Sequence, residues 1–305
     1  MVMLGHMAEV SGRDGLLSWM GFGFRMPFFI GLSGYLLNRA RIIGMPWPSL
    51  LGKYWRRMIL PWLVAGLFYI IVAAKPVGPM TLAELIVWPP FHLWFVPVLF
   101  WLTLLARMLG RQMPPFAMVA LFAPVSIAAM YYFGVGHAII ERDLMLPDRR
   151  YFVYPLYFAF GMWVAASDPF RVARPWAAML AGLAALWWAG MYFRPDLAGE
   201  VGAKLLLNLS LIALLPKIAS WSLKMPMVER VGRESLYFYL WHPIVYALLI
   251  VLGLSGVAMF ATSMVILFMA LPPMQTMPLM CRIMGIQRAE QEAGGPLPDH
   301  MAQPA

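Results

Sequence analysis

The chain has 305 residues, of which 62% are hydrophobic and 12% are charged, and its mean hydropathy is +0.73. Soluble domains have about 45–50% apolar and about 25% charged residues, so this composition excludes an ordinary soluble domain. The net charge of +9 comes mostly from Lys and Arg in short segments between apolar runs. That pattern is typical of membrane topology, so we predict no nucleic-acid partner. The expected fold is all-α, a polytopic transmembrane helix bundle.

Nine apolar segments approach the roughly 20 residues that a membrane-spanning helix needs. They lie near residues 18–38, 55–74, 91–109, 115–135, 151–167, 175–193, 204–223, 235–253 and 256–280. Residues 1–7 have the composition of the last turns of a further helix, so we expect the chain to begin inside a truncated first helix. Residues 1–286 are predicted to form one integral membrane domain. Residues 287–305, rich in Gly, Pro, Gln and Glu, are expected to be a disordered cytoplasmic tail.

The distribution of basic residues predicts the orientation of these spans. If the segment between the first two spans is cytoplasmic and the spans alternate, 15 of the 23 Lys and Arg residues lie in the cytoplasm. The far side receives the other 8, including Arg25 and Lys204, the latter at the start of the span predicted near 204–223. Because short cytoplasmic loops carry an excess of Lys and Arg, this bias predicts a cytoplasmic C-terminus.

The first predicted full span contains residues that a simple membrane anchor does not need. Its run Phe24-Arg25-Met26-Pro27-Phe28-Phe29-Ile30-Gly31-Leu32-Ser33-Gly34-Tyr35-Leu36-Leu37 includes an arginine, a proline, two glycines and a serine. An arginine within hydrocarbon costs several kcal/mol unless it reaches water, an interface or a partner. The run therefore indicates a helix that lines a polar cavity in a protein interior.

A second run, Lys53-Tyr54-Trp55-Arg56-Arg57-Met58-Ile59-Leu60-Pro61, places three basic residues just before a span. Positive-inside topology alone explains many such clusters. Residues three and four apart on a helix share a face, so Lys53, Arg56 and Arg57 are also predicted to form one cationic patch. Arginine binds phosphate groups through two parallel hydrogen bonds and lysine binds them as a point charge, so the patch suits a phosphorylated ligand.

Three histidines stand at predicted helix ends or within a span. His6 follows Leu4-Gly5, and His92 opens the run His92-Leu93-Trp94-Phe95-Val96-Pro97. His242 ends the stretch Gly232-Arg233-Glu234-Ser235-Leu236-Tyr237-Phe238-Tyr239-Leu240-Trp241-His242, where helical spacing puts Ser235, Tyr239 and His242 on one face. Each histidine has a structural interpretation, as an interfacial or interhelical residue, beside the functional one.

Taken in order, these motifs resemble those of the membrane-bound acyltransferase type 3 family. The resemblance covers roughly residues 3–280 and implies ten transmembrane helices in the intact protein. The chain differs from the family pattern in three places: the basic residue eleven positions before His6 is absent, Lys53 replaces an arginine, and Arg25 stands where a histidine is frequent. The family moves acyl groups, usually acetyl from acetyl-CoA, across or onto the far face of the bacterial inner membrane.

The resemblance implies a role for each candidate residue. His6 would be the general base, and Arg25, His92 or a tyrosine would stabilise the oxyanion, with His92 and His242 as further candidate bases. Lys53, Arg56 and Arg57 would bind the phosphates of acetyl-CoA, the acyl donor, with Ser33 beside the entering thioester. No metal cluster is expected.

The function expected from the sequence is O-acyl transfer, most simply of acetyl, to a hydroxyl of an extracytoplasmic or lipid-linked glycan. The expected partners are acyl-CoA, a glycan or glycolipid acceptor and membrane lipids. The expected location is the bacterial inner membrane, crossed many times. Two alternatives remain open: a transporter or flippase of a polar or lipid-linked solute, and an inactive truncated relative of the acyltransferases.

Overall fold

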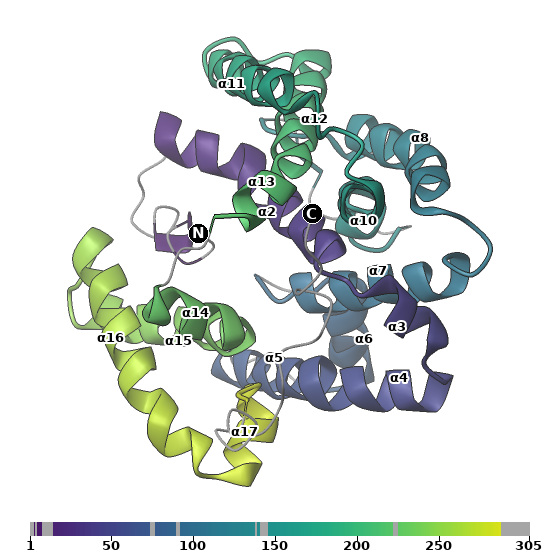
Figure 1. Cartoon of the computed structure of the whole chain (residues 1–305). Helices are drawn as coiled ribbons and strands as arrows, with labels where there is room; N and C mark the ends of the chain where they lie inside the picture. The colour runs from purple at the N-terminus through teal and green to yellow at the C-terminus, as the bar shows by residue number, and fades with distance from the viewer. Residues whose placement is uncertain are drawn as a thin grey trace. The chain divides into compact units, whose positions relative to one another are not determined.

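The computed structural model describes residues 3, 5–7, 15–73, 77–89, 92–137, 139–140, 146–221 and 225–287. Every regular element in these ranges is a helix (Figure 1). The chain divides into two compact units, which are described in turn. Unit 1 comprises Met1–Gly52 and Pro76–Lys224, and unit 2 comprises Lys53–Lys75 and Met225–Ala305. Except for Gln287, the predicted tail lies outside the described residues.

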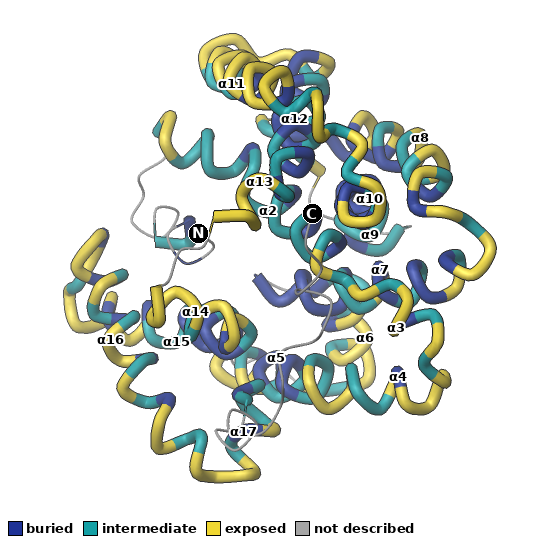
Figure 2. The backbone as a smooth tube through the Cα atoms, viewed as in Figure 1, coloured by how far each residue is buried: buried dark blue, intermediate teal, exposed yellow. Residues whose placement is uncertain are grey.

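Unit 1 is a helix bundle in which α2 contacts α10, α11 and α12. Its helices are α2 (Leu16–Tyr35), α3 (Arg39–Gly44), most of α4 (Trp47–Tyr54), α6 (Pro79–Val87), α7 (Phe95–Leu109), α8 (Pro115–Phe133), α9 (Arg150–Val153), α10 (Pro155–Ser167), α11 (Arg174–Met191), α12 (Leu197–Ala213) and α13 (Leu215–Ala219). Figure 2 shows that α10 is largely buried while α11 is exposed along much of its length. The core of unit 1 therefore lies where α2, α10 and α12 meet.

Glycines bring the backbones of α2 and α10 together. A Cβ atom on Gly34 would overlap the carbonyl oxygen of Phe158, and one on Gly161 would overlap the carbonyl oxygen of Gly31. Lipid tails are as apolar as the side chains that they meet, so membrane helices associate largely through close packing at small residues. Two of the glycines in the predicted polar span, Gly31 and Gly34, are therefore accounted for by helix packing.

Unit 2 is built around α5 and α15. Its helices are the end of α4, the π-helix η1 (Trp55–Ile59), α5 (Leu60–Val72), α14 (Pro226–Arg233), α15 (Ser235–Val251), α16 (Gly256–Gln275) and α17 (Pro278–Met284). The hydroxyl of Tyr69 on α5 donates to the carbonyl of Leu240 on α15 at 2.9 Å. The indole of Trp241 donates to the carbonyl of Met284 at 3.2 Å, which ties α15 to the end of α17.

Each of the nine predicted spans contains a helix, but the count of nine spans is not confirmed. Within the described residues, four helices are long and apolar enough to cross a membrane: Trp47–Val72, Pro115–Phe133, Leu197–Ala219 and Gly256–Gln275. A fifth candidate is the pair α14 and α15, which is bent by 86°. The other predicted spans contain shorter helices, such as α10 with 13 residues, or more polar ones. α2 is 20 residues long but contains Arg25.

One predicted boundary was wrong. α12 begins at Leu197 and not near residue 204, because the carboxylate of Asp196 caps the helix by accepting from the N–H of Gly199 at 2.6 Å. Lys204 therefore lies inside the helix, where only 4% of its surface is exposed. Four short helices, α3, α4, α6 and α14, fall where the sequence predicted no span, and α17 begins at the end of the span predicted near 256–280.

Candidate functional site

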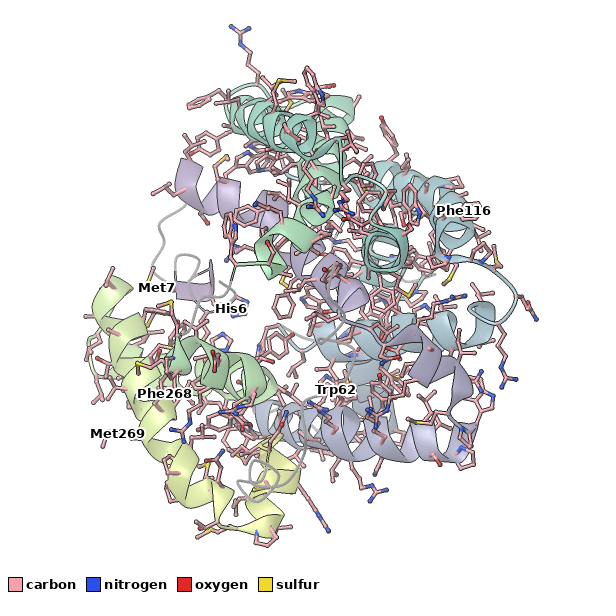
Figure 3. The ribbon with its side chains drawn as sticks, in the orientation of Figure 1. His6, Met7, Trp62, Phe116, Phe268 and Met269 are labelled. Atoms are coloured by element: carbon pink, nitrogen blue, oxygen red, sulfur yellow. The ribbon has the colours of Figure 1, made fainter. Side chains whose placement is uncertain are left out.

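The guanidinium group of Arg25 lies against the backbone of Gly5. Figure 3 shows His6 on the short helical turn near the N-terminus, and Gly5 precedes it on that turn. Nη1, Cζ and Nη2 of Arg25 are the atoms nearest to the side-chain position of Gly5. The Arg25 side chain also passes Gly21, one turn earlier on α2, whose Cβ would lie 3.1 Å from Nε. Arg25 thus extends from α2 to the residue next to His6.

His92 is the third basic side chain at this place in unit 1. It is 4% exposed and precedes α7. Its ring centroid lies 5.7 Å from that of His6, with the two rings nearly perpendicular at 73°. Three residues singled out separately in the sequence, His6, Arg25 and His92, therefore lie close together. Such a group combines a candidate base with donors that could stabilise a negative charge; the individual roles stay predictions.

A stack of aromatic rings supports the segment that carries His92. Trp94 stacks on Tyr154 with ring centroids 5.3 Å apart, and the guanidinium of Arg150 lies 4.6 Å from the centre of the Trp94 ring. Leu93 is completely buried. These neighbours restrict the backbone on the C-terminal side of His92.

Ser33 is less suited to ligand contact than the sequence suggested. Its hydroxyl donates to the carbonyl of Phe29 on its own helix at 2.9 Å. The rise of α2 places Ser33 about 12 Å along the axis from Arg25, two turns away. Its predicted role beside the thioester remains a prediction.

Lys53, Arg56 and Arg57 belong to unit 2 and stand on the long helix Trp47–Val72. Arg56 and Arg57 are exposed and lie in η1, a π-helical turn in which the N–H of Leu60 donates to the carbonyl of Trp55. Lys53 lies before η1 with its Nζ 6.0 Å from the centre of the Tyr54 ring. The predicted α-helical spacing of the patch is thus modified by a wider turn, a feature frequent at functional sites.

His242 is fully buried in α15 and its ring is oriented by a proline. Pro243 has no N–H, so the carbonyl of Tyr239 cannot accept its usual helical hydrogen bond. Nδ1 of His242 lies 3.0 Å from that carbonyl oxygen and 2.9 Å from the carbonyl oxygen of Phe238. Since a carbonyl only accepts, Nδ1 carries the proton and Nε2 is the basic nitrogen of the neutral ring. Of the predicted polar face, His242 is buried, whereas Ser235 is exposed at the start of α15.

Sequence reasoning missed a charged face inside unit 1. Glu200, Lys204 and Asn208 are spaced four residues apart on α12 and are 2%, 4% and 0% exposed. Ring Nδ1 of His137 lies 2.6 Å from Oε1 of Glu200, and the backbone N–H of His137 donates to Oε2 at 3.3 Å. We call Glu200, Lys204, Asn208 and His137 the α12 cluster. The repeat of four is visible in the sequence, but only Lys204 was considered there, as a far-side basic residue at the start of a predicted span.

Aromatic rings enclose the α12 cluster. Nζ of Lys204 lies 4.7 Å from the centre of the Phe22 ring and 5.7 Å from that of Trp188. Trp19 stacks on Trp188 with ring centroids 4.5 Å apart, and its ring centroid lies 4.2 Å from that of His137, with the two rings tilted by 34°. Each indole N–H of the tryptophan pair donates to the backbone carbonyl of the other tryptophan, at 2.8 and 3.0 Å. The α12 residues of the cluster are therefore buried, whereas the side chain of His137 is 37% exposed.

A comparison with protein families assigns the chain. A model described as an acyltransferase domain, that of the acyltransferase 3 family, matches residues 1–273. No curated protein and no solved structure matches the chain significantly. The matched range includes His6, Arg25, His92, the Lys53–Arg57 segment and His242. With most of its length matched by this one model, the chain belongs to the acyltransferase 3 family.

Proposed function

We propose that this protein is an integral membrane O-acyltransferase that transfers an acyl group, most simply acetyl, from acyl-CoA to a hydroxyl of an extracytoplasmic or lipid-linked glycan. Family membership supports acyl transfer by a membrane protein. The observation that carries the assignment to these residues is the grouping of His6, Arg25 and His92. Proposed with it are the bacterial inner membrane as location and a cytoplasmic C-terminus.

The reaction proposed for this group is attack of a hydroxyl on the thioester carbonyl. The imidazole of His6 accepts the hydroxyl proton while the oxygen forms a bond to the carbonyl carbon. Arg25 and His92 donate hydrogen bonds to the resulting oxyanion, a contribution of about 10²–10³ in turnover for one such donor. The carbon–sulfur bond then breaks, and His6 returns the proton to the departing thiolate. No net proton is consumed, and no metal is required.

The cationic residues of unit 2 are proposed to recognise the donor. Coenzyme A carries phosphate groups, and the exposed guanidinium groups of Arg56 and Arg57 match them in charge and geometry. Lys53 adds a third positive charge within the same helical segment. His242, whose Nε2 is the basic nitrogen, is the second candidate for the base.

The test is incorporation of isotope-labelled acetyl-CoA by membranes that contain the protein, followed by isolation of the labelled glycan. Label in the glycan that is lost in His6→Ala supports the proposal. Met7→Ala, on the same turn, is the matched control and should retain incorporation. If the glycan is still labelled in His6→Ala, another residue is the general base, and His242 is the next residue to test.

Transport is the second candidate, and the α12 cluster favours it. Buried ionisable residues within membrane helices often mark the path of a polar solute or an ion. A transporter should move its solute without coenzyme A, whereas the acyltransferase requires it. Solute movement across vesicles in the absence of acyl-CoA would favour transport over acyl transfer.

A further inference from the structure

Arginine side chains join the ends of two helices in unit 1. α3 packs against α7. Nη2 of Arg39, the first residue of α3, donates to the carbonyl oxygens of Gly110 and Met113, just beyond α7, at 2.5 and 3.0 Å. In the opposite direction, Nη2 of Arg107 on α7 donates to the carbonyl oxygen of Met45, just beyond α3, at 3.2 Å. α3 and the end of α7 therefore meet on one side of unit 1.

Arg107 is a buried positive charge. Only 3% of its surface is exposed, its guanidinium carbon lies 5.1 Å from the centre of the Trp47 ring, and its buried Nε has no hydrogen-bond partner in the described part of the chain. Burial of a charge is costly unless the charge is paired and hydrogen-bonded. The end of a helix, with about half a unit of negative charge, and the face of a tryptophan ring attract a cation but do not neutralise it. Arg107 therefore leaves positive charge where α3 meets α7.

Two more arginines add to this charge. Arg39 is half-buried, and Arg111, which is exposed, lies in the chain between the two residues whose carbonyl groups Arg39 binds. We call Arg39, Arg107 and Arg111 the α3–α7 arginine group. None of the three forms an ion pair with a described residue, and residues 15–83 and 85–140 contain no Asp or Glu. Arg174, in contrast, pairs with Asp168 in the segment that joins α10 to α11. Within the described structure, no carboxylate balances the charge of the α3–α7 arginine group.

Exposed apolar side chains adjoin the α3–α7 arginine group. Trp47 is 41% exposed and Met108 is 55% exposed. α8, one of the helices long and apolar enough to cross a membrane, begins four residues after Arg111, and Phe116 in its first turn is 58% exposed (Figure 3). Tryptophan is enriched at the level of the lipid headgroups. An anion bound by the arginines would therefore lie beside a surface suited to acyl chains.

We propose that the α3–α7 arginine group binds the phosphate of an anionic phospholipid from the surrounding membrane. The guanidinium groups of Arg39 and Arg111 donate hydrogen bonds to the phosphate oxygens, the charge of Arg107 adds attraction, and the acyl chains lie along α8. Basic sites between membrane helices bind anionic headgroups on the cytoplasmic side, where the predicted orientation places these arginines.

The adjoining apolar surface favours a lipid over coenzyme A, which also carries phosphate groups and whose proposed site is in unit 2. The inference requires a membrane protein but does not depend on the acyl-transfer reaction. It assigns a ligand to three arginines that the proposed reaction does not use.

The experiment titrates the detergent-solubilised protein with dioleoylphosphatidylglycerol, which is anionic, and with dioleoylphosphatidylcholine, which is zwitterionic. Native mass spectrometry measures the lipid retained, and tryptophan fluorescence during heating gives the melting temperature. We expect phosphatidylglycerol to be retained and, at about 100 times its Kd, to raise the melting temperature by roughly 5 °C or more. Phosphatidylcholine should have little effect on either measurement.

Arg111→Gln should weaken phosphatidylglycerol binding about fivefold, the effect of one basic residue near a membrane surface. Its side chain is exposed, so the variant should fold. Arg171→Gln, at another exposed arginine on the same predicted side of the membrane, is the matched control. It removes the same charge and should leave lipid binding unchanged. Arg39→Gln also removes a link between α3 and α7, so it is tested by lipid retention alone, which should fall.

Three results would overturn the inference. The first is equal retention of the two lipids, and the second is an equal loss of phosphatidylglycerol binding in Arg111→Gln and Arg171→Gln. The third is found by titrating the same variants with coenzyme A: if Arg111→Gln weakens coenzyme A binding but not lipid binding, the arginines bind the acyl donor. Lipid binding that follows the expected pattern in a protein that transfers no acyl group would support the lipid site and contradict only the proposed function.

Discussion

Replacing Glu200 with glutamine removes the negative charge of the α12 cluster without changing its size. The buried carboxylate accepts from both the ring and the backbone N–H of His137, and it lies one helical turn from the buried ammonium of Lys204. A hydrogen bond to a charged group contributes about 1.5–3 kcal/mol, so loss of the charge that strengthens both bonds from His137 amounts to about 3–5 kcal/mol. We expect Glu200→Gln to lower the free energy of unfolding by about 3–5 kcal/mol, or roughly 10 °C in melting temperature.

The assay is tryptophan fluorescence during heating of the detergent-solubilised protein. Glu229→Gln, at an exposed residue of α14, is the matched control and should change the free energy of unfolding by less than about 0.5 kcal/mol. Adding Lys204→Met to Glu200→Gln removes the uncompensated positive charge, so it should restore part of the lost stability. The reasoning fails if Glu200→Gln has the melting temperature of the wild type. It also fails if the double variant loses the sum of the stability losses of Glu200→Gln and Lys204→Met measured singly.

Three further outcomes are expected. Arg56→Ala should weaken binding of coenzyme A by roughly 1.5–3 kcal/mol, measured by calorimetry on the purified protein, while Arg171→Ala, another exposed arginine, leaves binding unchanged. Gly34→Ala should lower the melting temperature because its Cβ meets the backbone of α10, whereas Gly182→Ala, in open space, should not. A reporter enzyme fused after residue 288 should be active only in the cytoplasm, and periplasmic activity would contradict the orientation predicted from the basic residues.

The positions of the long helices were largely predictable because long apolar runs have few other interpretations. The errors in the predicted helix boundaries occurred where polar residues lie in the protein interior. Glu200 and Lys204 lowered the apolar character of the first turns of α12, so the predicted span began too late. The cap at Asp196 was a local signal for the true start, since aspartate commonly precedes a helix.

The contacts of the candidate site depend on tertiary structure and could not be predicted. His6 and Arg25 were identified from separate motifs. No rule of sequence spacing predicts that the side chain of Arg25 lies next to Gly5, the residue before His6. The pairing of His137 with Glu200 joins residues 63 positions apart in the chain. A lone histidine in a loop gave no reason to expect that partner. Pro243, in contrast, has a local effect that could have been deduced, because it always frees the carbonyl four residues before it.

The composition of α2 follows from the contacts that its surface makes. Gly23 leaves room for the indole of Trp188 on α11, and its carbonyl accepts from Asn208 on α12 at 2.9 Å. Gly31 and Gly34 allow the close approach of α12 and α10, whose atoms a Cβ at either position would overlap.

Arg25 is the one strongly polar residue of α2, and its side chain serves a different contact from those of the glycines. A helix with these requirements cannot be uniformly apolar, which is why α2 does not resemble a simple anchor. The packing and chemical requirements are separable. Substitution of a packing glycine such as Gly34 should lower stability, because its Cβ would meet the carbonyl oxygen of Phe158 on α10, whereas substitution of Arg25 should act on the proposed chemistry.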